Sequence, residues 1–152
     1  RGLGDVYKRQ GKRKGILVFT RFLKEAERLT MSIPGCVIVS GDTPKKERER
    51  ILEMFKVGEI PVVANVGVLT TGFDYPELDT VVMARPTMSL AMYYQIVGRC
   101  IRPHKDKEAA WFVDLCGNIN RFGEVSDLHL KDTGNGKWAV FSRGRQLTNV
   151  RF

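Results

Sequence analysis

The sequence predicts an α/β fold, in which a parallel sheet is covered by helices on both faces. Short runs of β-branched and other apolar residues alternate with segments of helical periodicity from residue 15 to about residue 114. The runs have no polar face, as is typical of strands buried on both sides of a parallel sheet. Because crossovers between parallel strands are right-handed, the loops that follow the strands should line one edge, where ligands of open α/β sheets bind.

Five apolar runs are predicted to be strands, at residues 16–19, 36–39, 61–64, 80–83 and 111–113. Helices are expected to connect them. The first helix ends before Pro34-Gly35, and its apolar residues recur at helical spacing. The second should be capped by Thr43, with Pro44 at its first position, and is stopped by Gly58. Its apolar face consists of Ile51, Met54 and Phe55.

The last part of the chain has a weaker pattern. Ser89 can cap a third helix that runs to about Gly98, before the fifth strand. Beyond residue 121, a Gly-Asn-Gly turn at 134–136 lies between residues 128–131 and 138–141, which predicts a terminal hairpin. The expected organisation is therefore an α/β domain at residues 15–121 and a short C-terminal extension at 122–152.

The first residues are not assigned to the fold. Residues 1–14 have no helical or strand period, begin at Arg1 rather than Met, and hold a basic run at 8–14. We expect an unstructured basic leader, with residues 1–10 open to being a non-native junction. The same features suggest that the chain is a fragment.

Composition excludes several classes of protein. The 152 residues carry 25 Lys and Arg against 17 Asp and Glu, a net charge of +8, which favours a polyanionic partner. No apolar run reaches the ~20 residues needed to cross a bilayer, so no membrane association is expected. Cys36, Cys100 and Cys116 are widely spaced and form no C-x-x-C pair. They are typical of reduced thiols, which favours a cytoplasmic protein without a zinc site.

Two arginines end the third predicted helix. Arg99 and Arg102 are three residues apart, so they face the same side, and Pro103 turns the chain away. A guanidinium offers a rigid fork of donors suited to triphosphate oxygens or to charge that develops during phosphoryl transfer. The alternative is a structural role, in which both arginines pair with carboxylates such as Glu108 or Asp114.

The segment at residues 63–76 follows a buried strand, so it should lie on the ligand edge of the sheet. Its small and hydroxyl residues expose backbone N–H groups, and Gly67 and Gly72 permit close approach of an anion. Asp74 could accept hydrogen bonds from a sugar hydroxyl. The alternative is an ordinary connecting loop in which residues 74–76 make a turn.

A third group combines Ser40-Gly41-Asp42 with Lys45 and Arg48 of the next helix. The N-terminus of a helix, with its free N–H groups and positive dipole end, can bind a phosphate. The alternative is that Lys45 and Arg48 belong to the solvated face of an amphipathic helix.

In this order and spacing, the three groups resemble the second RecA-like domain of superfamily 2 helicases and translocases. The resemblance implies a RecA-like, P-loop NTPase-type sheet over residues 15–114. Residues 69–74 are most similar to DNA-directed members, namely phage and prophage helicases, restriction-type translocases and RadD-like DEAD/DEAH helicases. The matching blocks are motif IV at 16–20, the Gly-Asp…Arg segment at 40–48, motif V at 65–74 and motif VI, Gln-x-x-Gly-Arg-x-x-Arg, at 95–102.

The resemblance implies a set of residues that bind and hydrolyse ATP. Arg102 would be the arginine finger on the γ-phosphate, and Arg99 a second phosphate contact or a coupling residue. Gln95 would lie near the nucleotide or the attacking water. Asp74 would contact the ribose or link motif V to motif VI, and Gly72 would let the backbone pass.

The same resemblance implies contacts with the sugar–phosphate backbone of one nucleic-acid strand. Such contacts read no base sequence, so a translocase can step along any strand. The residues expected to make them are Thr20, Arg21, Gly41, Arg48 and Asn65.

Part of the ATP site is missing from this sequence. No G-x-x-x-x-G-K-[ST] loop and no Asp-Glu pair occur in it. ATP with Mg²⁺ would be held mainly by an N-terminal RecA-like domain, and this chain alone should be inactive. The expected function is the C-terminal half of an ATP-dependent helicase or translocase acting on nucleic acid, with DNA favoured over RNA. The alternatives are a non-catalytic α/β nucleotide- or nucleic-acid-binding module, and a RecA-like domain that has lost its activity.

Overall fold

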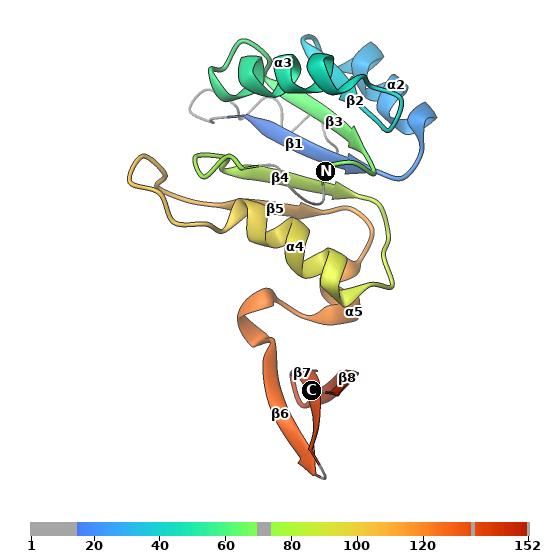
Figure 1. Cartoon of the computed structure of the whole chain (residues 1–152), viewed down its shortest axis with the longest axis vertical. Coiled ribbons are helices and arrows are strands. Elements are labelled where there is room, and N and C mark those ends of the chain that lie inside the picture. The colour runs from blue at the N-terminus through green and yellow to red at the C-terminus, as the bar shows by residue number, and fades with distance from the viewer. Residues whose placement is uncertain (1–14, 70–73, 135, 152) are drawn as a thin grey trace.

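The chain folds into a parallel sheet flanked by helices, followed by a smaller antiparallel sheet (Figure 1). The computed structural model describes residues 15–69, 74–134 and 136–151. Gly72 lies outside the described residues, as do residues 1–14. In the described part, no helix is long and apolar enough to cross a membrane.

The larger sheet has five strands in the order β2-β3-β1-β4-β5, and every neighbouring pair is parallel. This confirms the predicted α/β fold class. Thr20 at the end of β1 lies beside Val66 of β3 and Ala84 of β4, so these strands end at one common edge. The strands are β1 (Ile16–Thr20), β2 (Cys36–Val39), β3 (Val62–Val66), β4 (Thr80–Ala84) and β5 (Trp111–Asp114).

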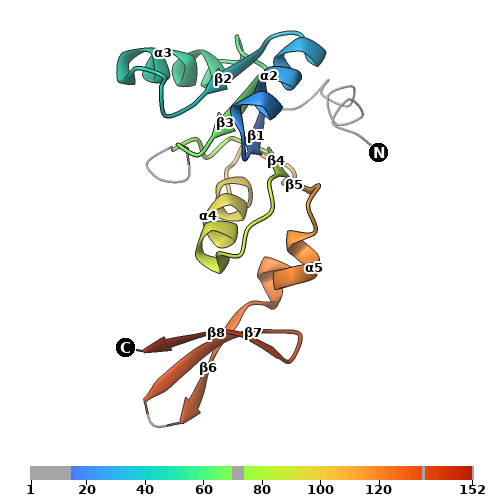
Figure 2. The same ribbon diagram turned by 90° about the vertical axis from the view of Figure 1, so that its right-hand side faces the viewer.

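Helices cover both faces of this sheet (Figure 2). Alternate residues of β1 point to opposite faces, as the two-residue period of a strand requires. Leu17 and Phe19 pack with Phe55 of α3 (Lys45–Lys56) and Ile96 of α4 (Leu90–Cys100). Ile16 and Val18 pack against Leu29 of α2 (Leu23–Ser32) and Ile33, which follows it. Two separate apolar cores therefore hold the sheet between its helices.

Two helix starts test the predicted caps. Ser89 caps α4 as expected, because its Oγ accepts a hydrogen bond from Met92 N at 3.2 Å. The expected cap by Thr43 is wrong: Thr43 Oγ1 accepts from Ser40 N at 3.0 Å, and Pro44 occupies the cap position of α3. The hydroxyl of Thr43 closes the preceding turn and is no longer available to the helix.

The C-terminal part is more elaborate than the predicted hairpin. A short helix, α5 (Asn118–Phe122), and a 3₁₀ turn, η1 (Val125–Asp127), lead into it. The expected pairing is present, since β6 (His129–Gly134) runs antiparallel to β7 (Lys137–Ser142). A third strand, β8 (Arg145–Arg151), pairs with β7. We did not predict β8, because its mostly polar sequence has too few apolar residues to show a buried strand face.

The extension is fastened to α4 through a narrow contact around Gly123. The Tyr93 hydroxyl donates to the Gly123 carbonyl at 2.9 Å, and the Tyr93 ring stacks on Phe122 with centroids 5.2 Å apart. Gly123 has φ 84° and ψ 179°, a conformation that is essentially restricted to glycine. A Cβ there would lie 2.0 Å from Ser142 Oγ, so the two segments meet too closely for any other residue.

We predict that Gly123→Ala lowers the free energy of unfolding by ~3 kcal/mol, because it adds backbone strain to a steric clash. Gly144→Ala is the matched control, since Gly144 also has positive φ but has no atom within 4 Å of its added Cβ. That control should cost ~1–2 kcal/mol from backbone conformation alone. Urea titration followed by circular dichroism measures both. Equal losses in the two variants would contradict the proposed close packing at Gly123.

Candidate functional site

The residues singled out in the sequence lie at two opposite edges of the parallel sheet. Thr20 and Asn65 lie at the carboxyl ends of their strands. The C-terminal end of α4 lies at the other edge, because Cys100 Sγ hydrogen-bonds to Asp79 O, at the start of β4, and to Trp111 O, the first residue of β5. A strand of five residues spans roughly 15 Å, which is the scale of this separation.

This arrangement corrects one expectation about residues 63–76. Their first residues lie on the carboxyl edge, as predicted, but Asp74 does not. Asp74 contacts Arg102, which follows α4 at the amino edge. The segment leaves β3 at one edge and must reach the start of β4 at the other, because the two strands are parallel.

An ion pair joins Asp74 to Arg102. Arg102 Nη1 lies 2.6 Å from Asp74 Oδ1, and the side chains remain 50% and 73% exposed. Asp114, an alternative partner suggested by the sequence, instead accepts hydrogen bonds from the backbone N–H groups of Cys116 and Ile119. An exposed pair of this kind contributes only ~0–1 kcal/mol. Arg102 is therefore open to exchange its carboxylate for another anion.

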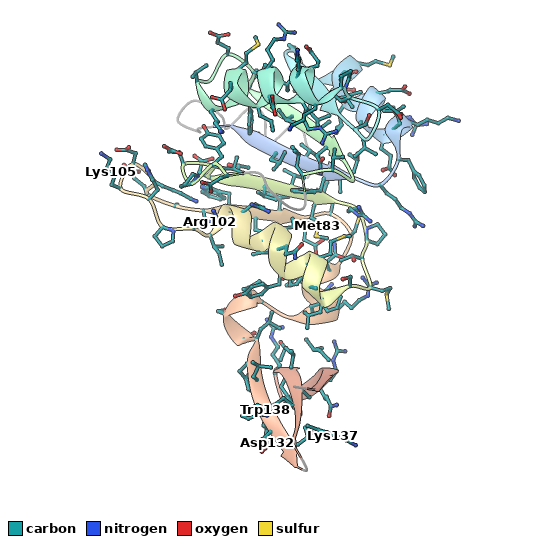
Figure 3. All side chains as sticks on the ribbon, viewed as in Figure 1. Met83, Arg102, Lys105, Asp132, Lys137 and Trp138 are labelled. Carbon is teal, nitrogen blue, oxygen red and sulfur yellow. The ribbon has the colours of Figure 1, made fainter. Side chains whose placement is uncertain are left out.

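The structure brings Gln95, Arg99 and Arg102 together around one open depression of about 460 Å³. Figure 3 shows Arg102 at the C-terminal end of α4. Partial burial lowers the pKa of the Arg99 guanidinium, as does the neighbouring Arg102 charge, while Asp74 opposes both effects. Arginine remains charged under all ordinary conditions, so the depression carries two close cations. The rest of its lining consists of Tyr94, Gly98, Ile101 and Pro103.

Lys107 is a further residue of this edge, and no sequence pattern marked it. Its Nζ donates to Arg102 O at 2.9 Å and to Pro76 O at 3.3 Å. It thereby fastens the end of the arginine helix to the segment that carries Asp74. Burial lowers the pKa of its ammonium group. The contact depends on two loops that meet only in the folded chain.

At the carboxyl edge, the side chains of Thr20 and Asn65 are buried, with 1% and 0% of their surfaces exposed. Asn65 Oδ1 accepts hydrogen bonds from Val68 N at 3.2 Å and Leu69 N at 2.9 Å. Thr20 Oγ1 donates to Asn65 O at 3.4 Å. Both side chains therefore shape this edge from within, and the predicted contact of the two residues with a nucleic-acid strand stays a prediction.

The remaining residues of the group lie at the surface. Arg21 and Gly41 are exposed, and Arg48 is partly buried. The Arg21 guanidinium lies over the Phe22 ring at 4.9 Å, and Arg48 Nη2 donates to Thr43 O at 3.1 Å. Within the part of the chain that the structure describes, neither arginine forms an ion pair. This edge therefore presents two guanidiniums that no described carboxylate pairs with.

A third arginine of the carboxyl edge, Arg85, was not singled out in the sequence. It follows β4 directly and is partly buried. Its Nε is buried without a hydrogen-bond partner, as is Arg48 Nε. Its place immediately after a predicted strand was the one available signal. Among the described residues, no group of three or more His, Cys, Asp or Glu side chains could hold a metal ion.

Comparison with known proteins agrees with this geometry. The family model described as "Helicase conserved C-terminal domain" matches residues 3–104. The chain is 38% identical over 79 residues to the putative ATP-dependent helicase IRC3 of Saccharomyces cerevisiae, covering 52% of this chain and 12% of that protein. It is 34% identical over 104 residues to a 51.5 kDa protein of a Lactococcus phage, covering 67% and 23%. The DNA 3'-5' translocase XPB2 of Sulfurisphaera tokodaii is 36% identical over 100 residues, covering 64% and 22%.

Solved structures share the fold. A fragment of a putative HsdR subunit of a type I restriction enzyme from Vibrio vulnificus aligns with a TM-score of 0.66 and 25% identity, over 82% of this chain and 27% of that one. The C-terminal domain of the DEAD-box protein Dbp5 aligns with a TM-score of 0.57 and 23% identity, over 77% and 72%. The chain covers less than a quarter of each of the three sequence relatives above. It belongs to the helicase conserved C-terminal domain family, and its α/β domain is a RecA-like helicase domain.

Proposed function

We propose that this chain is the C-terminal half of an ATP-dependent helicase or translocase that acts on nucleic acid, with DNA favoured over RNA. The observation that carries the proposal is the open depression at the amino edge, where Gln95, Arg99 and Arg102 gather and the partner of Arg102 is an exposed carboxylate, Asp74. A phosphate-rich ligand completes such a site. The family match supplies the class of reaction.

In this proposal, the phosphates of ATP replace Asp74 as the partner of Arg102. Arg102 then stabilises the charge that develops on the γ-phosphate, while Arg99 holds a second phosphate oxygen. Gln95 orients the attacking water or the nucleotide. Once released, the Asp74 carboxylate can accept hydrogen bonds from the ribose. Gly72 would let the backbone pass close to the nucleotide.

The other half of the ATP site would come from an N-terminal RecA-like domain. That domain would contribute the phosphate-binding loop and the acidic residues for Mg²⁺, neither of which this sequence contains. Bound Mg²⁺ would neutralise phosphate charge. Closure of the two domains would bring Arg99 and Arg102 to the phosphates, and opening after hydrolysis would release them.

The strand would bind at the opposite, carboxyl edge. Arg21, Gly41 and Arg48 lie at that surface, and unpaired guanidiniums attract phosphates without reading base sequence. Thr20 and Asn65 would act indirectly, because their side chains are buried beneath this surface.

Three similarities favour DNA as the substrate. One relative is named a DNA 3'-5' translocase, one solved structure is a restriction-enzyme subunit, and the wording of motif V resembles DNA-directed helicases. Other matches are DEAD-box RNA helicases, and one such structure contains bound RNA. Comparing stimulation of ATPase activity by single-stranded DNA and by RNA of equal length decides between them.

In the complete protein, we predict that Arg102→Ala lowers the rate of nucleic-acid-stimulated ATP hydrolysis by on the order of 10³-fold, because arginine fingers contribute that much to phosphoryl transfer. Arg50→Ala is a matched control: Arg50 is also an exposed, ion-paired arginine, but it pairs with Glu47 on the outer face of α3. A coupled assay for released phosphate measures both. Near-normal turnover in Arg102→Ala, or no hydrolysis in the unsubstituted protein, would overturn the proposed reaction.

Substitutions at Asn65 and Arg21 should have different effects, the first on stability and the second on oligonucleotide binding. We predict that Asn65→Ala lowers the free energy of unfolding by ~1–3 kcal/mol, because the partly buried N–H of Val68 and the buried N–H of Leu69 lose their acceptor. Arg21→Ala should leave stability within ~0.5 kcal/mol and weaken binding of a single-stranded oligonucleotide. Thermal unfolding and fluorescence anisotropy measure the two properties. If Arg21→Ala binds as tightly as the unsubstituted chain, this edge does not hold the strand.

A further inference from the structure

Arg85 lies beside Arg21 at the carboxyl edge of the sheet. Thr20 and Ala84 are partners in the register of β1 and β4, so the residues that follow them leave neighbouring strands. Adjacent strands are about 4.8 Å apart. The two arginines therefore start from neighbouring points of one edge, although they are far apart in the sequence.

The backbone at Arg85 is held in place by a buried network. Asn118 Nδ2 donates to Arg85 O at 3.0 Å, and Asn118 Oδ1 accepts from Thr87 N at 2.9 Å. Asp114 Oδ1 in turn accepts from Asn118 Nδ2 at 2.9 Å. Asn118 is fully buried, so this loop is a rigid platform and not a mobile connection. A side chain on such a platform is positioned before any ligand arrives.

The Arg85 guanidinium has no acceptor within the described part of the domain. Its Nε is buried and makes no hydrogen bond, and no carboxylate in the described ranges lies within ion-pair distance. Buried polar groups in native proteins are almost always paired, so an unpaired one calls for an explanation. By contrast, Arg50, Arg102 and Arg143 all form ion pairs with carboxylates of the domain.

The carboxylates of this end of the sheet are already engaged. Glu25 Oε2 accepts hydrogen bonds from the backbone N–H groups of Arg21 and Phe22. Asp114 accepts from Ile119 N at 2.7 Å as well as from Asn118. Both carboxylates thus accept hydrogen bonds from backbone N–H groups or from Asn118, and neither forms a described ion pair with Arg21 or Arg85.

We propose that Arg85 is a strand-binding residue, which together with Arg21 grips a phosphodiester group of the bound nucleic acid. The proposal deepens the proposed function and rests on it. A guanidinium can form two parallel hydrogen bonds to a phosphate, and phosphate oxygens are the acceptors that the domain does not provide. The loop at residues 85–87, which Asn118 holds by hydrogen bonds, would fix the position of the phosphate relative to β1 and β4. This contact recognises the backbone that DNA and RNA share.

Fluorescence anisotropy with a fluorescein-labelled oligothymidine, and with the matching oligouridine, tests the proposal on the 152-residue chain. Arg85→Ala should raise Kd for the oligonucleotide about tenfold. The slope of log K against log salt should fall by about 0.7, the loss expected for one phosphate contact on a single strand. Arg85→Lys should restore part of the affinity, because it keeps the charge but not the fork of donors.

The matched control is Arg50→Ala, which removes the same charge from the outer face of α3. It should leave both Kd and the salt slope nearly unchanged.

If Arg21→Ala weakens binding but Arg85→Ala behaves like Arg50→Ala, Arg85 has no contact with the strand and this inference alone fails. If the unsubstituted chain binds neither oligonucleotide, the proposed strand-binding edge fails and the inference with it. If Arg85→Ala does not fold, Arg85→Lys carries the test: because lysine keeps the charge but not the fork of donors, an unchanged Kd contradicts a forked phosphate contact.

Discussion

Helix α4 runs antiparallel to strand β4, and this direction fixes which edge of the sheet each group of arginines reaches. A helix that connects two parallel strands must return the chain from the carboxyl edge of the sheet to the amino edge. Residues that follow strands, such as Arg21 and Arg85, therefore lie at one edge, while Arg99 and Arg102 lie at the other. The same covering helices bury both faces of the sheet, so the two edges are held at a fixed separation by a close-packed core.

The segment after β3 links these two edges. It begins at Asn65, whose buried side chain fixes the backbone of Val68 and Leu69, and it continues to Asp74 at the ion pair with Arg102. Lys107 holds the far end of the same segment to the end of the arginine helix. In the proposed function, this segment would connect the ATP site to the strand-binding edge.

Pairing divides the arginines of this chain into groups. Arg50 and Arg143 have carboxylate partners on the surface, where each pair contributes little to stability. Arg102 has a partner that is exposed and exchangeable. Arg48 and Arg85 each bury an Nε that the domain leaves without an acceptor.

The five strands, their alternation with helices along the chain and the Ser89 cap could be predicted from the sequence, because apolar periodicity and side-chain chemistry are local properties. It also marked Arg99, Arg102 and Asp74 as residues of interest through their spacing. Three contacts or positions came from the folded structure alone: Asp74 meets Arg102, Asn65 and Thr20 lie inside the domain, and Arg21 and Arg85 follow neighbouring strands. β8 also depended on it, since a polar edge strand is stabilised by pairing with β7 and not by its own pattern. Each of these features depends on residues that are distant in the chain. Their contacts result from the packing of the sheet and its helices, so no local sequence pattern predicts them.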